Sequence, residues 1–520
     1  MKKIATALLS CALAAATLAG CAANAAQVPQ ESQEPHTAAL TATAAASVKS
    51  PKYVFLFIGD GMSYPQIQST SDYLGALKDA DYWQAQPSLD DNQGAILDGP
   101  EYLNFMNFEA AGSAVTYDSN SFAPDSASTA TSISTGYKTY SGSINVDETG
   151  SKKYETIAEK LKEQKGWEIG VISSVNLNHA TPAAFYAHQA SRSSYYEIGL
   201  ELVESGFDYF AGGGLLKPTG SSGDQTDLYE LAQEAGYTVA KTHAEADAIG
   251  TNTEKAIIID EDLADSDAMA YELDRTDDMW ALADYVAKGI EVLDNDTGFF
   301  MMCEGGKIDW ACHANDAASS IHDTQALADA VQVAIDFAKE HADETLILVT
   351  GDHETGGLTI GFAGTDYDTY LDLLENQKIS FAKYDSDYVA SYKANKTPFE
   401  TVLADIEKLF GLKAQGEEGD KLVLTAYEME QLRAAYEKSI NGTASSQYDQ
   451  AEYVLYGTYE PLSVTITHII NNKSGISFTS YSHTGLPVAV LAEGAGSEMF
   501  NGYYDNTDIY NKLADLLNIA

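Results

Sequence analysis

The stretch that decides the fold is residues 52–61, which read KYVFLFIGDG. An unbroken apolar run closed by a glycine turn is typical of a strand that is buried on both faces of a parallel sheet. Similar runs recur at residues 168–175, 298–303, 345–350 and 487–491. Between these runs, apolar residues repeat at intervals of three and four, as at residues 154–161 and 327–335, which predicts helices. We therefore expect an α/β fold, a three-layer sandwich in which helices flank a largely parallel central sheet.

Length and composition exclude several classes of protein. With 520 residues, the chain is far larger than a peptide hormone, a small toxin or an isolated binding module. Hydrophobic residues make up 45% of it, which is enough for a packed interior. Asp and Glu number 77 against 30 Lys and Arg, and the net charge of −47 disfavours binding to nucleic acids or to an anionic membrane. The 4 cysteines are too few for a disulfide framework.

The N-terminal region predicts export. Residues 1–20 combine two early lysines with an apolar stretch that is too short to span a bilayer, as in a signal peptide. The stretch ends in LAGC at residues 18–21 and resembles the bacterial lipobox, in which the cysteine, here Cys21, is lipidated. Cleavage near residues 23–26, as in an ordinary signal peptide, is the alternative. Residues 21–50 have the composition of a flexible tether. We expect a periplasmic or cell-surface protein that is anchored to the membrane by lipid alone.

Carboxylates and imidazoles gather where the predicted strands end. In open α/β sheets, ligands bind beyond the carboxyl ends of the strands. The residues placed there are Asp60, Glu304, Asp309, His313, Asp352, His353 and His483. Asp309 and His313 are four residues apart, so they share a face if their segment is helical. Nitrogen and oxygen ligands of this kind suit zinc, and oxygen-rich positions suit magnesium, so the convergence predicts a site for divalent cations.

Each of these residues also has an ordinary structural interpretation. An aspartate after a strand often caps a turn or a helix, and the aspartate–histidine pair four residues apart could lie on the surface. His468 lies in the same region as His483 and is an alternative ligand. Cys303 and Cys312 flank the candidate ligands Glu304 and Asp309 in the sequence. They could pair, stay as two buried thiols, or serve as soft zinc ligands.

A nucleophile and a phosphate-binding arginine can be proposed from two further segments. The small residues at 124–131 can open a helix whose first N–H groups favour an anion. Ser126 would either cap that helix or, facing a metal ion, lose its proton and act as a nucleophile. Arg192 offers a planar pair of donors that suits phosphate oxygens, although a surface ion pair is its alternative role in so acidic a chain.

Five segments together resemble the alkaline phosphatase family, in the order and at the approximate spacing found there. They are Asp60-Gly61-Met62, Asp125-Ser126-Ala127, His179–Ala183, Glu304–Asp309 with His313, and Asp352–Gly357. The resemblance implies a catalytic domain over residues 51–363 and 476–520. Residues 364–475, rich in Tyr and Asp, are then an insertion with predicted helices at residues 397–410 and 426–439. In the family a comparable insertion forms a crown near the active site and often lies at a dimer contact, so a homodimer is expected.

The resemblance also implies a site with two zinc ions and one magnesium ion. The first zinc would be held by Asp309, His313 and His483. The second zinc would be held by Asp60, Asp352 and His353. The magnesium would be held by Asp60, Thr181 and Glu304. His179 and Trp310 would flank the magnesium, at positions where some members carry a carboxylate and a lysine.

The same resemblance assigns the phosphoryl chemistry. Ser126 would form a phosphoserine intermediate, and Arg192 would clamp the phosphoryl oxygens with Asp125 steadying its side chain. We therefore expect an exported, metal-dependent alkaline phosphatase that hydrolyses small-molecule phosphate monoesters. A phosphodiesterase or sulfatase of the same superfamily is one alternative, although residues 126–130 lack the Pro and Arg of the sulfatase motif. A non-catalytic lipoprotein that scavenges metal or phosphate is the alternative from another class.

Overall fold

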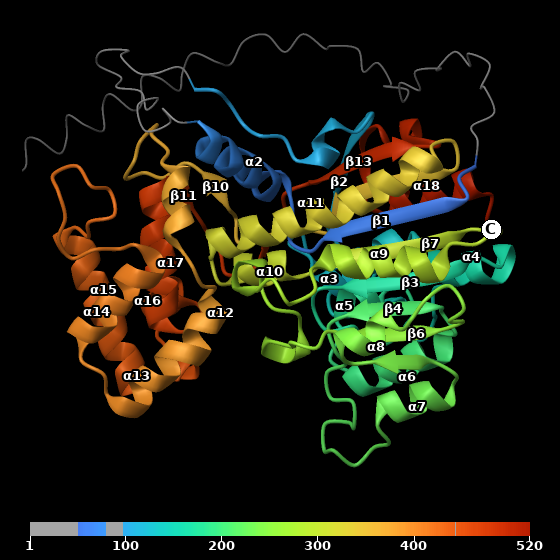
Figure 1. The fold of residues 1–520 in the computed structure, drawn as a ribbon, viewed down its shortest axis with the longest axis horizontal. Coiled ribbons are helices and arrows are strands. Elements are labelled where there is room, and N and C mark those ends of the chain that lie inside the picture. Colours follow the sequence, from blue (N-terminus) through green and yellow to red (C-terminus); the bar gives the residue numbers. More distant parts are fainter. Residues whose placement is uncertain (1–49, 80–96, 443) are drawn as a thin grey trace, which may run out of the picture. The chain divides into compact units, whose positions relative to one another are not determined.

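The computed structural model describes residues 50–79, 97–442 and 444–520. Within them a ten-stranded sheet in the order β14-β2-β13-β8-β1-β7-β3-β4-β6-β5 lies between two layers of helices (Figure 1). This arrangement confirms the predicted α/β sandwich. The predicted signal peptide, Cys21 and the tether lie outside the described residues. No helix in the described part of the chain is long and apolar enough to cross a membrane.

The middle of the sheet is built from the predicted strands. β1 (Tyr53–Gly59) lies between β7 (Phe299–Gly305) and β8 (Thr345–Gly351), and β3 (Glu168–Ser173) lies beyond β7, all in parallel. β13 (Val488–Gly494) runs antiparallel to β8. Because β13 is reversed, the segment before it arrives at the edge of the sheet where the parallel strands end.

Five strands of the sheet were not predicted from the sequence. They are β2 (Ala110–Val115), β4 (Tyr209–Gly212), β5 (Thr238–Ala240), β6 (Ala256–Ile259) and β14 (Gly502–Asp505). Their lengths run from three to six residues, and β2 reads AAGSAV, so none presents a long apolar run. Pairing with longer neighbours holds such strands in place, because their own propensity is weak.

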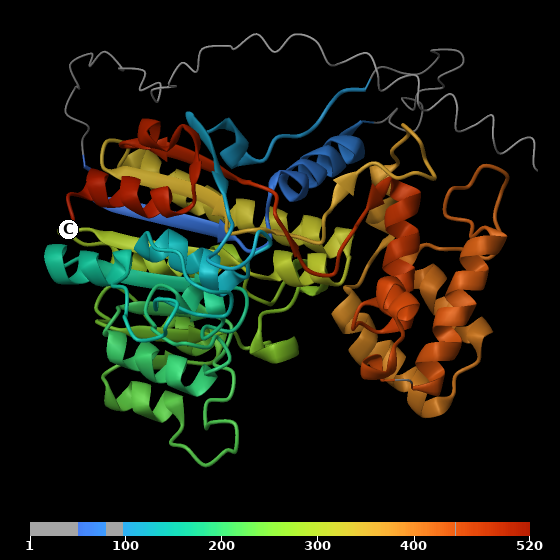
Figure 2. The ribbon, with the colours of Figure 1, turned by 180° about the vertical axis from the view of Figure 1, so that it is seen from behind.

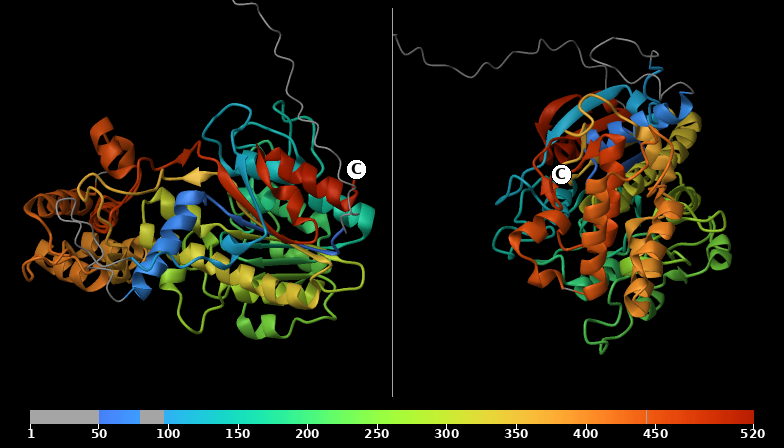
Figure 3. Two further views of the ribbon diagram at one scale, coloured as in Figure 1. Left: turned by 90° about the horizontal axis from the view of Figure 1, so that it is seen from above. Right: turned by 90° about the vertical axis from the view of Figure 1, so that its left-hand side faces the viewer.

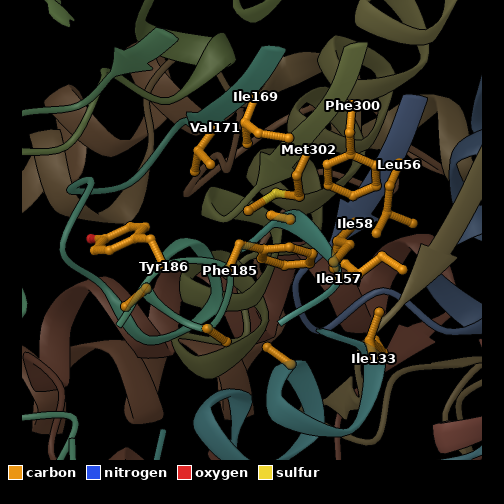
Figure 4. Packing of buried hydrophobic residues seen from close by; sticks show 14 of the residues in the cluster. Leu56, Ile58, Ile133, Ile157, Ile169, Val171, Phe185, Tyr186, Phe300 and Met302 are labelled. Carbon is orange, nitrogen blue, oxygen red and sulfur yellow. The ribbon is translucent and has the colours of Figure 1, made fainter. Parts of the chain in front are cut away.

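Alternate residues of β1 enter two separate apolar clusters on opposite faces of the sheet. Leu56 and Ile58 pack on one face with residues such as Phe300 of β7 and Ile133, as Figure 4 shows. Phe55 and its odd-numbered neighbours pack on the other face. The residues of β1 are buried throughout, which explains the unbroken apolar run in the sequence.

Helices cover both faces. The first face, seen in Figure 2, carries α3 (Ser126–Thr135), α4 (Ile157–Lys165), α5 (Ala180–Ala183), α6 (Tyr195–Ser205), α7 (Leu228–Glu234) and α18 (Thr507–Leu517). The second face carries α2 (Tyr64–Lys78), α8 (His243–Asp247), α9 (Leu282–Leu293) and α11 (Ala317–Glu340). The short helix α10 (Lys307–His313) follows β7 directly.

Two short two-stranded sheets complete the carboxyl edge of the main sheet. β9 (Glu354–Thr355) pairs with β12 (His483–Thr484), and β10 (Thr359–Ile360) pairs with β11 (Ile476–Ser477). Both pairs join the chain just after β8 to the chain just before β13. They bring residues near position 483 back to the strand ends after the long insertion.

The insertion, residues 364–475, is helical and has an apolar cluster of its own. It contains α12 (Phe381–Tyr384), α13 (Ala390–Asn395), α14 (Phe399–Phe410), α15 (Ala426–Asn441), α16 (Gln450–Tyr456) and α17 (Pro461–Ser474). The two predicted helices correspond to α14 and α15, whereas α17 was not predicted. The cluster extends to Tyr73 of α2 and Ile321 of α11. Figure 3 shows these helices grouped beyond one end of the sheet. The boundaries of the insertion stay a prediction.

Candidate metal centre

The ends of three neighbouring strands bring four candidate ligands together. Asp60 follows β1, Glu304 is the last residue but one of β7, and Asp352 and His353 follow β8. Gly61 has a φ of +71°, and its N–H donates to Asp352 Oδ1 at 3.1 Å. A Cβ at Gly61 would come within 2.9 Å of the Cα of Asp309, so only glycine allows this close approach.

The helix α10 and the β9–β12 pair add the remaining candidate ligands. Asp309 and His313 lie one turn apart on α10, with Oδ1 and Nε2 at 3.3 Å, as their spacing predicted. His483 is paired with Thr355 across β9 and β12, and its Nε2 lies 3.0 Å from His313 Nε2. Its ring stacks on that of His353 with the centroids 3.7 Å apart.

Backbone carbonyls hold two of these histidines in one tautomer. Nδ1 of His313 lies 2.6 Å from the carbonyl of Tyr481, and Nδ1 of His483 lies 2.6 Å from that of Pro124. Each Nδ1–H therefore donates to a carbonyl, which leaves each Nε2 directed towards Asp309 and available to a metal ion, as in metal-binding imidazoles. His468, the alternative ligand, instead contacts Asn315 Oδ1 at 3.0 Å and lies outside the described ligand groups.

Three groups in the described residues, two of which share Asp60, have the spacing needed for a metal ion. They are Asp309, His313 and His483; Asp60, Asp352 and His353; and Asp60, His179 and Glu304. Asp60 Oδ1, Glu304 Oε1 and His179 Nδ1 are buried and have no hydrogen-bond partner. Buried polar atoms without partners are costly, so the residues fit divalent cations that would supply the missing contacts. Thr181, predicted as a ligand, places Oγ1 3.4 Å from Asp60 Oδ2.

The carboxylates of this centre repel one another. Burial, followed by the charge of Asp352, raises the pKa of Asp60 well above its ordinary value. Burial also raises the pKa of Glu304 and that of Asp352, each to about 7. At Asp309 burial acts in the same direction, but the neighbouring His313 and His483 imidazoles bring its pKa well below the ordinary value. Cations at this centre would stabilise all the ionised forms at once.

The predicted nucleophile lies inside this centre. Ser126 is the first residue of α3, and Asp125 caps the helix by accepting from Ser128 N at 3.1 Å. Ser126 is 1% exposed, and its Oγ lies 3.2 Å from His353 Nε2. The serine hydroxyl therefore faces the group formed by Asp60, Asp352 and His353.

Arg192 is held by two partners at the rim of the centre. Its Nη1 donates to Asp125 Oδ2 at 2.8 Å, and its Nη2 donates to His179 Nε2 at 3.0 Å. Burial and the adjacent guanidinium lower the pKa of His179 to about 3, so the imidazole is neutral and accepts this hydrogen bond. Burial alone would raise the pKa of Asp125, but the charge of Arg192 holds it below its ordinary value.

A cavity of about 460 Å³ opens onto the serine and the arginine. Its outer wall includes four aromatic residues: Tyr271, Trp310, Phe381 and Tyr459. Of these, only Trp310 was predicted from the sequence to lie near the site, and its ring contacts that of His179 with the centroids 5.9 Å apart. The other three lie in segments without a recognisable motif. Cys303 and Cys312 are both buried and free, so the possible disulfide between them is absent.

A buried serine hydroxyl beside clustered carboxylates and imidazoles, at the carboxyl edge of an α/β sheet, places the chain among the metal-dependent hydrolases. Comparison with known families narrows this class. Residues 51–519 match the model of the family described as Alkaline phosphatase, and the chain belongs to that family. It is therefore a metal-dependent phosphatase that acts on phosphate monoesters and uses divalent metal ions.

Relatives and solved structures agree with this assignment. The chain is 30% identical to alkaline phosphatase 4 of Bacillus subtilis over 473 residues, which span 89% of this chain and 88% of the relative. The cold-active alkaline phosphatase of Shewanella sp. superposes with a TM-score of 0.68 at 27% identity, covering 89% of this chain and 99% of the other. The Thermus thermophilus alkaline phosphatase shares the fold, with a TM-score of 0.71 at 22% identity, covering 95% of this chain and 96% of that one.

Proposed function

We propose that this protein is an exported alkaline phosphatase that hydrolyses small-molecule phosphate monoesters through a phosphoserine intermediate. The observation that carries this proposal is the position of Ser126 Oγ, 3.2 Å from His353 Nε2 and thus at the edge of a candidate metal group. A serine that only capped its helix would not need to face imidazole and carboxylate groups, and Asp125 already caps α3.

The donor sets support two zinc ions and one magnesium ion. Asp309, His313 and His483 combine nitrogen and oxygen donors that suit zinc. Asp60, Asp352 and His353 form a second set of the same kind. The third position, with Asp60, Thr181 and Glu304, offers oxygen atoms that suit magnesium.

His179 affects how firmly the third position can hold magnesium. Its neutral ring accepts from Arg192 and cannot supply the negative charge that a carboxylate would give a bound magnesium. The solved structures that resemble this chain include histidine-to-glutamate and histidine-to-aspartate variants of the TAB5 alkaline phosphatase, each with magnesium bound in its M3 site. The oxygen atoms of Asp60, Thr181 and Glu304 favour magnesium here, and the neutral His179 should hold it less firmly than a carboxylate would.

The chain's own residues perform the phosphoryl transfer as follows. Ser126 Oγ attacks phosphorus, an O–P bond to the serine forms, and the bond to the leaving alcohol oxygen breaks. The alcohol departs with the proton that Ser126 gives up, and water then attacks the phosphoserine, its oxygen going to phosphate and one of its protons restoring the serine hydroxyl. Arg192 donates to two phosphoryl oxygens in both steps, while Asp125 keeps its guanidinium in place. The bound metal ions would lower the pKa of the serine and of water and stabilise the leaving oxygen.

Export, lipid attachment at Cys21 and assembly into a homodimer belong to the same proposal. They are supported by the apolar start of the chain and its LAGC sequence, and by the family's use of the insertion at a dimer contact. Radiolabelled fatty acid incorporation that is lost in Cys21→Ser tests the anchor. Size-exclusion chromatography with light scattering tests the dimer.

Replacing Ser126 separates the enzyme from the scavenging lipoprotein. Ser126→Ala should lower turnover of p-nitrophenyl phosphate by several orders of magnitude while metal content stays unchanged. Ser132→Ala is the matched control, because Ser132 lies in the same helix, is buried, belongs to none of the candidate metal groups, and its hydroxyl donates to the Ser128 carbonyl at 3.1 Å. Equal activity in the two variants would contradict the proposal. Faster turnover of bis-p-nitrophenyl phosphate than of the monoester would instead favour the diesterase alternative.

A further inference from the structure

The cavity is larger than a phosphoryl group needs. Its volume of about 460 Å³ falls within the range of sites for small organic molecules, about 300–1,000 Å³. Ser126, Arg192 and the candidate metal ligands occupy its inner end, and the aromatic wall formed by Tyr271, Trp310, Phe381 and Tyr459 encloses the remainder. Whatever alcohol leaves from the phosphorus therefore lies against this wall.

The aromatic wall is built by two parts of the chain. Tyr271 and Trp310 belong to the part that carries the sheet, and Phe381 and Tyr459 belong to the insertion. Phe381 stands between the two tyrosines: its centroid lies 5.7 Å from that of Tyr271 and 5.9 Å from that of Tyr459, in edge-to-face contacts. Such contacts set the angles of the rings, so the wall has a defined shape.

A buried lysine fixes the inner half of the aromatic wall. The Lys307 side chain is fully buried, and its Nζ lies 3.9 Å from the centroid of Tyr271 and 4.9 Å from that of Trp310. The same Nζ donates to Asp265 Oδ1 at 2.9 Å. One ammonium group therefore holds two rings and a rim carboxylate in a single arrangement, which lowers the cost of ordering them around a ligand.

Two observations distinguish this wall from simple packing between the insertion and the sheet. Phe381, Tyr459 and Trp310 keep part of their surface exposed to the cavity. Tyr271 is 1% exposed, and its hydroxyl has no hydrogen-bond partner among the described residues. A buried hydroxyl without a partner on a cavity wall is a group that a ligand can satisfy.

The charge of the lining limits the ligand further. Among the described residues that line the cavity, Arg192 is the only lysine or arginine, and the phosphoryl group engages it. Asp265 and Ser266 form the rim near the aromatic wall. Lys307 lies behind the aromatic wall and is already paired with Asp265, so a leaving group with its own negative charge would meet no free cation there. A neutral ring with hydrogen-bonding edges would meet aromatic faces, a tyrosine hydroxyl and a carboxylate.

We propose that the aromatic wall is a leaving-group subsite for phosphate monoesters that carry a flat, uncharged ring, the class that includes nucleoside 5′-monophosphates. This inference rests on the proposed function and adds the substrate class to it. Adenosine 5′-monophosphate and ribose 5-phosphate are the matched probes. Both release a primary ribose hydroxyl and carry the same charge, and they differ in the base alone.

The test compares kcat/KM for the two esters in the wild-type holoenzyme and in the double variant Phe381→Leu/Tyr459→Leu. Stacking of a base on aromatic side chains contributes about 1–3 kcal/mol, so the wild type should prefer the nucleotide about fivefold to 150-fold. In the double variant the ratio should fall towards one. Turnover of ribose 5-phosphate should fall much less than turnover of the nucleotide, because ribose has no base to stack, and inhibition by inorganic phosphate should stay unchanged, because it reports on the inner end of the cavity.

Tyr427→Leu is the control, because Tyr427 lies in the insertion, is 69% exposed and does not line the cavity. It should keep the wild-type ratio. A wild-type ratio near one, or a ratio that survives the double variant, would overturn the subsite while leaving the phosphatase intact. Failure of the wild type to hydrolyse either ester would instead overturn the proposed function, and the subsite with it.

Discussion

Buried carboxylates gather in two regions of this molecule, and their oxygens are satisfied in different ways. At the metal centre, Asp60 and Glu304 each keep an oxygen without a hydrogen-bond partner. At the junction between the sheet and the insertion, each carboxylate oxygen of Asp316 accepts two hydrogen bonds. Oδ1 accepts from Ser319 N and Gln377 Nε2, and Oδ2 accepts from Ser319 Oγ and Phe381 N. The first region is incomplete without cations, whereas the second is complete within the protein.

This difference separates a functional cluster from a structural one. Burial and crowding raise the pKa of Asp352 to about 7, so without cations the metal centre is held together against electrostatic repulsion. The junction instead uses a carboxylate to join α11 to the start of α12, and so it positions Phe381 of the aromatic wall. Substitutions in the two regions should therefore have opposite effects on activity and stability.

The largest effect is expected from Asp352→Asn. Loss of one candidate ligand should lower kcat/KM for p-nitrophenyl phosphate by more than about a hundredfold, since even the partners of metal ligands are worth about 10–100-fold. The metal-free protein should melt at the same or a higher temperature than metal-free wild type, because one crowded charge is removed. A lower melting temperature of the metal-free variant would show that this carboxylate is structural.

Asp316→Asn should have the opposite effect: a loss of stability with little change in activity. The amide would turn its NH₂ towards a donor and leave buried groups unpaired, which costs about 1–3 kcal/mol. Urea unfolding should show this loss, while kcat per folded molecule changes by less than about threefold. A large drop in kcat without loss of stability would contradict the division between the two regions.

Asp385 in the insertion is a buried carboxylate outside the metal centre, and it should make the stability of the protein depend on pH. Asp385 Oδ1 is buried without a partner and belongs to none of the candidate metal groups. Burial raises the pKa of Asp385 to about 8 from an ordinary value of 3.8. The folded state therefore holds a proton that the unfolded state releases, so this group's stabilisation is full below about pH 4 and is lost as the pH rises towards 8.

Asp385→Asn should remove that pH dependence. Wild type should lose up to about 1.4 kcal/mol of unfolding free energy per pH unit between pH 5 and 7 from this group, and the variant should not. The measurement is urea unfolding at pH 5, 7 and 9. Parallel curves for the two proteins would show that Asp385 is ionised in the folded state.

The smallest effect concerns magnesium. His179→Asp adds a negative charge to the third candidate group. The affinity for magnesium should therefore increase by about tenfold, so that more magnesium stays bound after dialysis while the zinc content is unchanged. Elemental analysis across a magnesium titration measures it. Equal magnesium affinity in the two proteins would show that the oxygen atoms of Asp60, Thr181 and Glu304 suffice.

The sheet and the strand-end residues could be predicted because they depend on local sequence. The run at residues 52–61 identifies a buried strand, and the four-residue spacing of Asp309 and His313 identifies a shared helical face. Short strands such as β2, and helix α17 of the insertion, were missed because neighbours determine their structure. The aromatic wall was missed for a related reason: Tyr271, Phe381 and Tyr459 meet only after the insertion folds against the sheet.

The hydrogen-bond network around the metal centre also lay beyond the sequence. No pattern indicates that the Pro124 and Tyr481 carbonyls set the histidine tautomers, or that His179 accepts from Arg192. The choice of His483 over His468 follows from the antiparallel direction of β13 and the β9–β12 pair, which are properties of the folded sheet.

Divalent cations are expected to complete the buried centre around Ser126. Metal analysis of the purified protein, combined with p-nitrophenyl phosphate turnover before chelation, after chelation and after addition of zinc and magnesium, tests it most directly. We expect about two zinc ions and one magnesium ion per chain, loss of turnover on chelation and recovery when both metals are restored. Full turnover in protein shown to be free of metal would contradict it.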